Sequence, residues 1–385
     1  MNCQKHLFNL KPDAHYLNCA SKSPLLKSAE EASIKALIRG RNPMDIAPVD
    51  FFSEVENVRI AFGRIINCAA SSVALIPASS YGFSSVLNNV IAKKGGNAII
   101  MKEEFPSGYF ALKRWCETNS NALTVVEPDW NLTFLGEDWN TKILEAINEN
   151  TSVVLLSAIH WMTGLKFDLK AIGERCALVG AVFIVDGSQS VGALPMNVEE
   201  YQIDALVCAG YKWLFGSYSL SLLYMGDKFK NGDPIEESWM NRTNAKTFSN
   251  LTQYESEYEP DAGRYNVGQT SNFILMPILK EGLQQINQWG PSNIQNYCQQ
   301  LIQPLMQYLE GLNGFSEPAA YFSNHLFALR LPKQINLELL QQNLAKNKVF
   351  ISVRDQYFRV SVNVFNTEQD IHQLIKTIDQ TIKNN

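Results

Sequence analysis

The chain has 385 residues, of which 46 % are hydrophobic and 18 % are charged, a composition typical of a globular protein with about two or three domains. Its formal net charge of −5 and pI near 5.7 offer no basic surface for nucleic acid or an anionic membrane. The seven cysteines and five histidines lack metal-ligand spacing, and no apolar run approaches the roughly 18 residues of a membrane span. We therefore expect a cytoplasmic protein that binds neither nucleic acid, membranes nor metal.

The first two thirds of the chain alternate helical periodicity with short apolar runs, which is the pattern of a βα protein. Because the runs are apolar on both strand faces, they indicate a mainly parallel sheet covered by helices. The expected helices are 51–67, 82–93, 107–118, 139–148 and 168–178, and the expected strands are 73–77, 97–101, 123–128, 152–159, 181–186, 204–210 and 219–225.

After about residue 265 the pattern changes, and it indicates a separate, smaller α+β domain. The region 228–265 has few apolar runs and is expected to connect the two domains. The expected helices of the smaller domain are 271–289, 291–312 and 367–383, and its expected strands are 325–331, 349–353 and 357–362.

Polar residues follow several of the expected strands. Asp186 ends one apolar run, His160 follows another, and Ser79 and Ser80 follow a third. Ligands of parallel sheets bind at these carboxyl ends, although Asp186 alone could be a turn residue and His160 a core histidine. Lys212 lies between two apolar stretches, where burial would lower the pKa of its amine toward that of a nucleophile. An amine nucleophile beside a strand-end carboxylate indicates a Schiff-base cofactor.

The stretch VDGSQSVGALPMNVEEYQIDALVCAGYKWLFG (185–216) resembles the class V aminotransferase family, pyridoxal-phosphate enzymes that include cysteine desulfurases, kynureninase and isopenicillin N epimerase-like proteins. Four further segments match the family pattern in order, at 16–21, 104–109, 264–273 and 358–371. The resemblance implies the α/β fold of type I, with a mainly parallel seven-stranded sheet. It also implies a large cofactor-binding domain (26–262), a small α+β domain (263–385) and an N-terminal segment (1–25) that joins the small domain.

The resemblance also implies roles for residues around the cofactor ring. Lys212 would hold pyridoxal phosphate as a Schiff base and move the Cα proton of the substrate. Asp186 would keep the pyridine nitrogen protonated, which makes the ring an electron sink. Gln189 would lie near the phenolic oxygen, and His160 replaces an asparagine of cysteine desulfurases. Phe105 would stack on the ring face, with simple core packing as the alternative.

The cofactor phosphate is expected at the start of the helix predicted for 82–93, where backbone N–H groups and the helix dipole favour an anion. The candidates are Ser79, Ser80 and Tyr81, together with Tyr211, which stands where many relatives have histidine. In the family a Gly-Thr pair of a second subunit completes the phosphate site. Here the matching residues are Gly268-Gln269-Thr270, with the choice between Gln269 and Thr270 left open. The resemblance thus implies a homodimer.

Arg359 is expected to bind the substrate carboxylate, because its segment is similar to a family motif and a guanidinium suits a carboxylate. A surface-paired strand arginine is the alternative. Asn18 would assist, whereas Arg242 could bind a second substrate group or be structural. The resemblance implies an amino-acid substrate and a keto-acid partner.

The reaction type depends on the step that comes after removal of the Cα proton. The only cysteine after residue 270 is Cys298, in a helical stretch, which disfavours desulfuration by a mobile cysteine. Transamination is expected, with epimerisation at Cα or elimination at Cβ as alternatives. A regulatory or degenerate scaffold is a further alternative, but it has no need of Lys212, Asp186 and Arg359 together. A nicotinamide enzyme is disfavoured because no G-x-G-x-x-G comes after the first strand.

Overall fold

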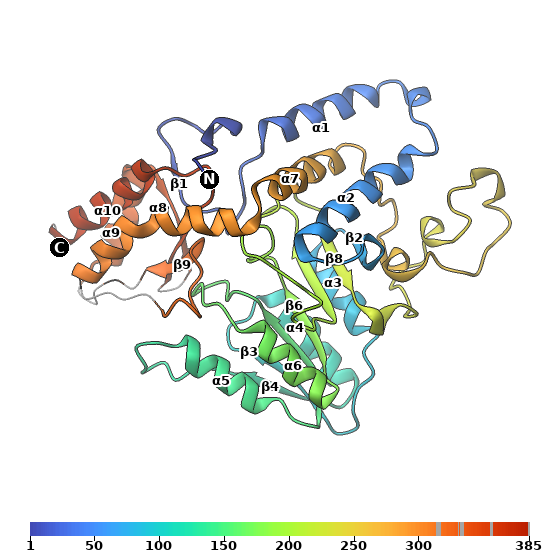
Figure 1. Cartoon of the computed structure of the whole chain (residues 1–385), viewed down its shortest axis with the longest axis horizontal. Coiled ribbons are helices and arrows are strands. Elements are labelled where there is room, and N and C mark those ends of the chain that lie inside the picture. Colours follow the sequence, from blue (N-terminus) through green and yellow to red (C-terminus); the bar gives the residue numbers. More distant parts are fainter. Residues whose placement is uncertain (313–316, 330, 332–334, 355–356, 384–385) are drawn as a thin grey trace.

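A seven-stranded sheet forms the centre of the larger part of the molecule (Figure 1). The computed structural model describes residues 1–312, 317–329, 331, 335–354 and 357–383. The strand order is β2-β8-β7-β6-β5-β3-β4, and β8 runs antiparallel to both of its neighbours whereas the other pairs are parallel. The expected mainly parallel sheet is thus observed. Its strands are β2 (Val73–Ile76), β3 (Asn97–Met101), β4 (Ala122–Val126), β5 (Thr151–Ser157), β6 (Val182–Asp186), β7 (Ala205–Ala209) and β8 (Ser221–Met225).

Alternate side chains of the strands enter two separate cores. Along β5, for example, Val153 and Leu155 belong to one core and Val154 and Leu156 to the other, because successive residues of a strand point to opposite faces. Helices α3 and α4 cover the first face, and α2, α5, α6 and α7 contribute to the second core. These helices are α2 (Asp50–Ile66), α3 (Ser79–Leu87), α4 (Pro106–Thr118), α5 (Gly136–Ala146), α6 (Leu169–Val179) and α7 (Met276–Trp289).

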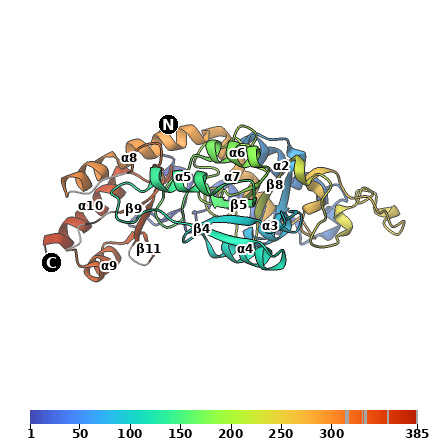
Figure 2. The same ribbon diagram turned by 90° about the horizontal axis from the view of Figure 1, so that it is seen from below.

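The smaller part contains a three-stranded antiparallel sheet and a pair of short parallel strands that joins residues far apart in the chain. The antiparallel sheet consists of β11 (Ser352–Arg354), β12 (Tyr357–Ser361) and β9 (Leu326–Leu329), and the parallel pair of β1 (His15–Tyr16) and β10 (Val349–Phe350). Its helices are α8 (Pro291–Gly311), α9 (Leu337–Lys346) and α10 (Glu368–Lys383). These helices lie at the end of the molecule opposite to the connecting segment, which is drawn in yellow (Figure 2).

Several expected boundaries differ from the structure. Helix α3 begins at Ser79 rather than at 82, and α7 begins at Met276 rather than at 271. The expected strand 349–353 forms two short strands, β10 and β11, because the two halves have different partners. Residue Arg330 of the expected strand 325–331 lies outside the described residues.

Two helices have no counterpart among the expected elements, namely α1 (Lys27–Arg39) and α9. In α1 only Ala29 is buried, so the helix has no buried apolar face within the chain. Helix α1 packs against α7, and so does α2. The domain boundaries expected at 25/26 and 262/263 stay a prediction.

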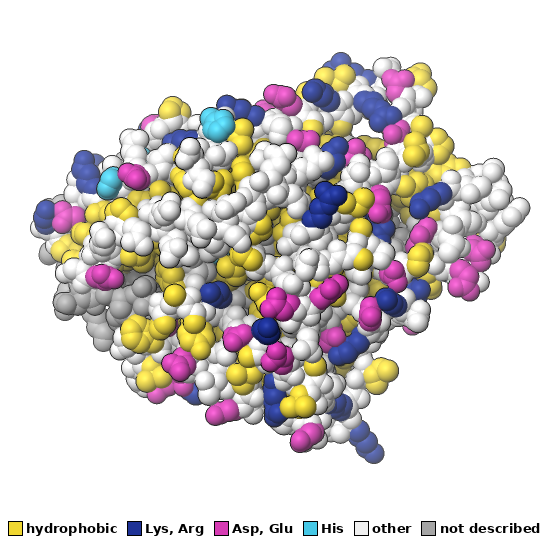
Figure 3. Space-filling model, viewed as in Figure 1, with side chains coloured by type: hydrophobic (Ala, Val, Ile, Leu, Met, Phe, Trp, Pro, Cys, Tyr) yellow, Lys and Arg dark blue, Asp and Glu magenta, His cyan; other side chains and the backbone are white. Residues whose placement is uncertain are grey.

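Acidic and basic side chains are interspersed on the face of the molecule shown in Figure 3. This face therefore presents no extended area of one charge sign. Within the described ranges, no helix is both long enough and apolar enough to cross a membrane.

Candidate active site

Asp186 and Lys212 lie at the carboxyl ends of two neighbouring parallel strands. Asp186 is the last residue of β6 and pairs with Val207 of β7, and Lys212 follows the end of β7. Their exposed fractions are only 6 % and 8 %. The amine nitrogen Nζ of Lys212 lies 5.4 Å from the ring centroid of Phe105, which is partly exposed and so is not a core residue.

The charged groups of the site act on one another. Burial raises the pKa of Asp186, whereas Lys212 and a hydrogen bond from the Ser188 backbone N–H, at 2.8 Å, lower it. Burial lowers the pKa of Lys212, Asp186 raises it in part, and Arg359 lowers it further. The sheet ends thus bring a carboxylate, an amine and a guanidinium within electrostatic reach.

Arg359 is a cation without a full set of acceptors. It lies on β12 with 2 % exposure, and burial lowers its pKa to about 10. Its Nη1 donates to the Trp161 carbonyl at 2.6 Å, but its Nε has no hydrogen-bond partner within the part of the chain described. The Oδ1 atom of Asn18 is also without a partner there, and Asn18 is bridged to Ser361 of the same strand as Arg359. Because buried polar groups are normally paired, these atoms indicate a ligand site.

Glu104, which sequence reasoning missed, is a second buried carboxyl group at this edge of the sheet. It accepts hydrogen bonds from the hydroxyl and backbone N–H of Ser157, at 2.5 and 2.7 Å, and from the Phe105 N–H at 2.7 Å. Ser157 pairs with Asp186 across β5 and β6. Burial and then Asp186 raise the pKa of Glu104 to about 7. The available signal was an acidic residue three positions after the apolar run 97–101, at the start of a segment that matches the family pattern.

His160 is completely buried, and both of its ring nitrogens have partners. Nδ1 lies 3.0 Å from the Thr163 hydroxyl, and Nε2 lies 3.2 Å from the Glu103 carbonyl. Burial lowers the pKa of His160 to about 4, so the ring is neutral at neutral pH. These contacts give His160 a structural task, and its role at a cofactor stays a prediction.

Gln189 follows β6 and Tyr211 follows β7, the neighbouring strand. The Gln189 side chain accepts a hydrogen bond from the Trp213 indole at 2.9 Å and donates to the Ala20 carbonyl at 3.1 Å. The Tyr211 ring centroid lies 5.9 Å from the Lys212 Nζ. Tyr211 is therefore close to Lys212, and the cofactor contacts of both side chains stay predictions.

The amino end of α3 provides backbone donors. Ser79 and Ser80 are the first residues of this helix, and the preceding Ala78 has no side-chain acceptor to cap it. Unpaired N–H groups and hydroxyls at a helix start suit a phosphate. Tyr81 is the next residue, and burial and then the Glu236 carboxylate raise its pKa.

The segment Gly268–Thr270 lies beside the edge strand β2, because the Val267 N–H donates to the Leu75 carbonyl at 2.9 Å. Thr270 is buried, and its hydroxyl donates to the Val267 carbonyl at 2.8 Å. Gln269 is exposed, with φ at 57°. Of the two candidates left open by the sequence, Gln269 has the side chain that is accessible to a second subunit.

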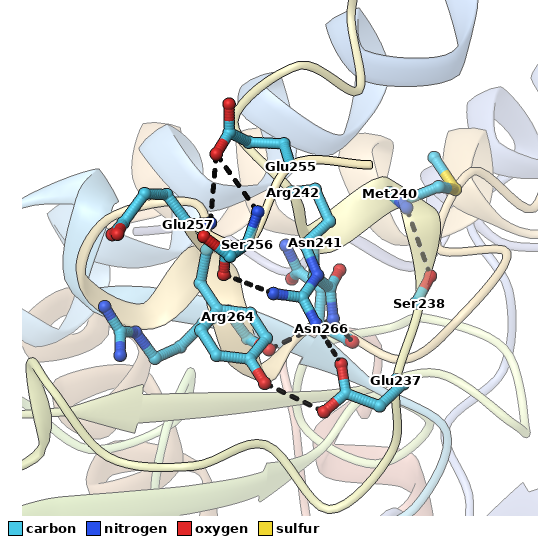
Figure 4. Close-up of polar contacts among 11 residues, drawn as sticks. Glu237, Ser238, Met240, Asn241, Arg242, Glu255, Ser256, Glu257, Arg264 and Asn266 are labelled. Carbon is cyan, nitrogen blue, oxygen red and sulfur yellow. Dashed lines mark hydrogen bonds and ion pairs between the residues drawn. The ribbon is translucent and has the colours of Figure 1, made fainter. Parts of the chain in front are cut away.

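Arg242 lies in the connecting segment, where its guanidinium is held by its own chain (Figure 4). It forms an ion pair with Glu237, donates to the Ser256 carbonyl at 2.5 Å and stacks on the Tyr258 ring at 3.9 Å. These contacts favour the structural role among the two that the sequence left open.

The residues fit pyridoxal phosphate. A buried amine suits the aldehyde, a strand-end carboxylate suits the ring nitrogen, and an uncapped helix start suits the phosphate. Arg359 Nε and Asn18 Oδ1, which lack partners among the residues that the structure describes, add a donor and an acceptor for an amino acid beside it.

Comparison with known proteins agrees with this chemistry. A sequence model of the family described as aminotransferase class-V matches residues 40–374. The uncharacterized aminotransferase YcbU of Bacillus subtilis (strain 168) is 22 % identical over 367 residues, which cover 93 % of this chain and 91 % of that protein. A kynureninase of Geobacillus thermodenitrificans is 21 % identical over 328 residues, which cover 80 % of this chain and 74 % of the kynureninase.

Solved structures share the fold. A mutant of C-DES with glycine covalently linked to its PLP cofactor has a TM-score of 0.84 and 17 % identity, covering 98 % of this chain and 99 % of that one. The apo cysteine desulfurase of Thermococcus onnurineus has a TM-score of 0.80 and 16 % identity, covering 100 % and 99 %. The expected family, fold class and cofactor are confirmed. The chain belongs to the class V aminotransferase family, whose enzymes have the type I fold and use pyridoxal phosphate.

Proposed function

We propose that this protein is an aminotransferase, which removes the amino group of an amino acid and passes it to a keto acid. The observation that carries the proposal is the convergence of Asp186, Lys212 and Arg359 in one buried site, with Arg359 Nε unpaired within the described residues. A regulatory scaffold would have no use for a buried guanidinium beside a buried amine when the guanidinium Nε has no partner among the described residues.

Each residue has a task in this proposal. Bound pyridoxal phosphate supplies the electron sink that no side chain can provide. Asp186 would hold a proton on its ring nitrogen, and the start of α3 would bind its phosphate. Arg359 and Asn18 would bind the substrate carboxylate.

Lys212 would take the proton from Cα. Burial and Arg359 lower the pKa of its amine, so a larger fraction is neutral and able to accept a proton near neutral pH. The site is nearly closed to water, which strengthens the interactions among its charges.

Epimerisation at Cα and elimination at Cβ are the alternatives, because both begin with the same proton removal. Elimination gains support from the relatives, since one solved neighbour is a complex of the cystine C–S lyase C-DES. Cysteine desulfurases are also among the relatives, but desulfuration by a mobile cysteine is disfavoured by the position of the one cysteine after residue 270. Cys298 is fully buried in α8, and burial raises the pKa of its thiol.

The proposal includes a homodimer in a reducing cytoplasm. Exposed apolar side chains on α1 favour a second copy as partner. All seven cysteines are free, which suits a reducing compartment.

The test compares Lys212→Ala with Arg359→Ala. Lys212→Ala should abolish incorporation of solvent deuterium at Cα, because it removes the base. Arg359→Ala should leave that base in place but lower kcat/KM by about 100-fold or more, mainly through KM, because a buried charge contact is lost. Borohydride reduction and peptide mapping should label Lys212. The control Lys166→Ala removes another lysine whose pKa burial lowers, and it should retain label and activity.

The products distinguish the reactions. Formation of a keto acid from the amino acid only when a second keto acid is present to accept the amino group supports transamination. Racemised amino acid without keto acid would replace the proposal with epimerisation, and loss of the substituent at Cβ would replace it with elimination. Exchange at the wild-type rate in Lys212→Ala would contradict the assignment of the base.

A further inference from the structure

Trp161, in the turn after β5, contacts three parts of the site at once. Its carbonyl accepts a hydrogen bond from Arg359 Nη1 at 2.6 Å, and its indole N–H donates to the Glu103 carbonyl at 2.7 Å. Its ring meets the Phe105 ring edge to face, with centroids 5.5 Å apart and planes at 89°. Phe105 in turn lies 5.4 Å from the Lys212 Nζ. Trp161 thus connects the carboxylate-binding guanidinium with the residues around the amine.

The turn that carries Phe105 depends on such contacts. Glu103 has a φ of 56°, in the left-handed region that residues other than glycine rarely adopt. A conformation of this kind persists only when surrounding contacts hold it. The Glu103 carbonyl has two ring nitrogens beside it, Trp161 Nε1 and His160 Nε2. The indole contact is the shorter, so its loss should affect the turn.

The orientation of Arg359 depends on the same residue. The guanidinium is planar and its N–H groups point in fixed directions. Because the Trp161 carbonyl occupies Nη1, the direction of the unpaired Nε is fixed as well. One residue therefore limits the position of both the guanidinium and the aromatic ring near Lys212.

We propose that Trp161 is a positioning residue for the amino-acid substrate. It sets the distance between Arg359, which binds the substrate carboxylate in this proposal, and the Phe105 ring beside the amine of Lys212. The inference rests on the proposed function, because it gives Arg359 and Lys212 those two tasks. Small errors in this distance should weaken substrate binding and slow proton removal, while cofactor binding at Asp186 and α3 is unaffected.

The experiment uses Trp161→Phe in the protein loaded with pyridoxal phosphate, with glycine as the probe. Phenylalanine keeps the backbone carbonyl and a smaller aromatic ring, and it removes the N–H that reaches Glu103. The Glu103 carbonyl keeps its longer contact with His160, so one hydrogen bond is lost. Since one hydrogen bond corresponds to about a fivefold change, half-saturating glycine should rise about fivefold, read from the cofactor absorption band. The amount of cofactor retained after borohydride reduction should equal that of the wild type.

The matched control is Trp130→Phe, because Trp130 is 41 % exposed and its ring contacts Trp139. It should bind glycine as the wild type does. Trp161→Ala should lose more than Trp161→Phe, because the contact with Phe105 is lost too. Thermal unfolding of each variant shows whether it is folded. If Trp161→Ala is unfolded, Trp161→Phe alone tests the inference.

Wild-type glycine binding in Trp161→Phe would overturn the inference and leave the proposed function intact. Loss of cofactor in parallel with glycine response would also overturn it, since Trp161 would then support the cofactor rather than the substrate. A wild type that shows no cofactor absorption and no response to glycine would overturn the proposed function itself, and this inference with it.

Discussion

Glu104 and Asp186 form a pair of buried carboxyl groups connected through Ser157, which pairs with Asp186 and donates two hydrogen bonds to Glu104. Two buried negative charges at this spacing oppose each other. Lys212 favours the charged form of Asp186, whereas burial and Asp186 favour the neutral form of Glu104. Burial raises the pKa of both carboxyl groups, and Lys212 opposes this rise at Asp186, whereas the pKa of Glu104 rises to about 7.

This difference predicts a pH-dependent stability. Below its ordinary pKa of 4.5, Glu104 is protonated in both the folded and the unfolded chain. As pH rises toward the folded value of about 7, the unfolded chain releases the proton first, so the folded state loses stability. Glutamine cannot ionise. The free energy of unfolding of Glu104→Gln should therefore rise relative to that of the wild type between about pH 5 and about pH 8. Any pH-independent loss caused by the substitution does not change this trend.

Urea unfolding of the protein without cofactor measures this effect, since ligand binding would add its own contribution. The control is Glu310→Gln, which changes an exposed carboxyl on α8. Its difference in stability from the wild type should be the same at about pH 5 and at about pH 8. A difference between Glu104→Gln and wild type that stays constant with pH would contradict the raised pKa.

At the residue scale, sequence patterns identified groups that stand at strand ends or in family motifs. Asp186, Lys212 and Arg359 belong to this set, and the structure brings them together. Glu104 lies three positions after an apolar run and could have been found. Trp161 could not, because its contacts use its own backbone carbonyl and the backbone of Glu103, which no residue type indicates.

At the scale of elements, helix α7 fixes the loop that comes after Lys212. A Cβ atom placed on Gly282 would lie 2.2 Å from the Leu214 carbonyl oxygen, so the helix approaches the loop as closely as glycine alone permits. The neighbouring Phe215 has a φ of 55°, which further restricts how the loop can shift. Packing against α7 thus fixes the backbone position from which the Lys212 side chain extends.

Gly282→Ala should lower the free energy of unfolding by about 1–3 kcal/mol, because the added methyl group forces the helix and loop apart. It should also weaken cofactor retention, because the loop carries Lys212. The control is Gly311→Ala at the end of α8, where a Cβ meets nothing within 4 Å. There alanine should be neutral or stabilise by up to about 1 kcal/mol. Equal stability of the two variants in thermal unfolding would contradict the role given to α7.

The strands of the large sheet could be predicted because each is a continuous apolar run with helices on both faces. The expected single strand 349–353 was wrong, since its halves pair with β1 and β12. The sequence of a strand does not by itself show which strand it pairs with. The start of α3 was missed by a few residues, because serine is common both in loops and at helix starts.

At the scale of the whole molecule, α1 has the surface expected of an interface. Ile34, Leu37 and Ile38 are 50 %, 57 % and 46 % exposed. Helix α1 also lines a groove of about 700 Å³ that it shares with Ser271 and neighbouring residues, close to the segment expected to reach a second subunit. A second copy of the chain would cover both features.

Leu37→Glu should therefore convert a dimer into a monomer at micromolar concentration. In a two-fold symmetric interface the charge is introduced twice, and burying each one costs several kcal/mol. The control is Leu178→Glu on α6, a leucine with 76 % exposure away from α1, which should remain dimeric. Sedimentation equilibrium separates the outcomes, and a wild type that is itself monomeric with full cofactor occupancy would refute the shared phosphate site.

The pairing of β1 with β10, and of Asn18 with Ser361, has a consequence for protein synthesis. The Ala20 N–H donates to the Ser361 hydroxyl across 341 positions of sequence. β6, which carries Asp186, and β7, which Lys212 follows, are synthesised long before residue 361. The part that carries Arg359, which we propose binds the substrate carboxylate, is made last, so a nascent chain contains Lys212 for some time before it can bind a substrate in this way.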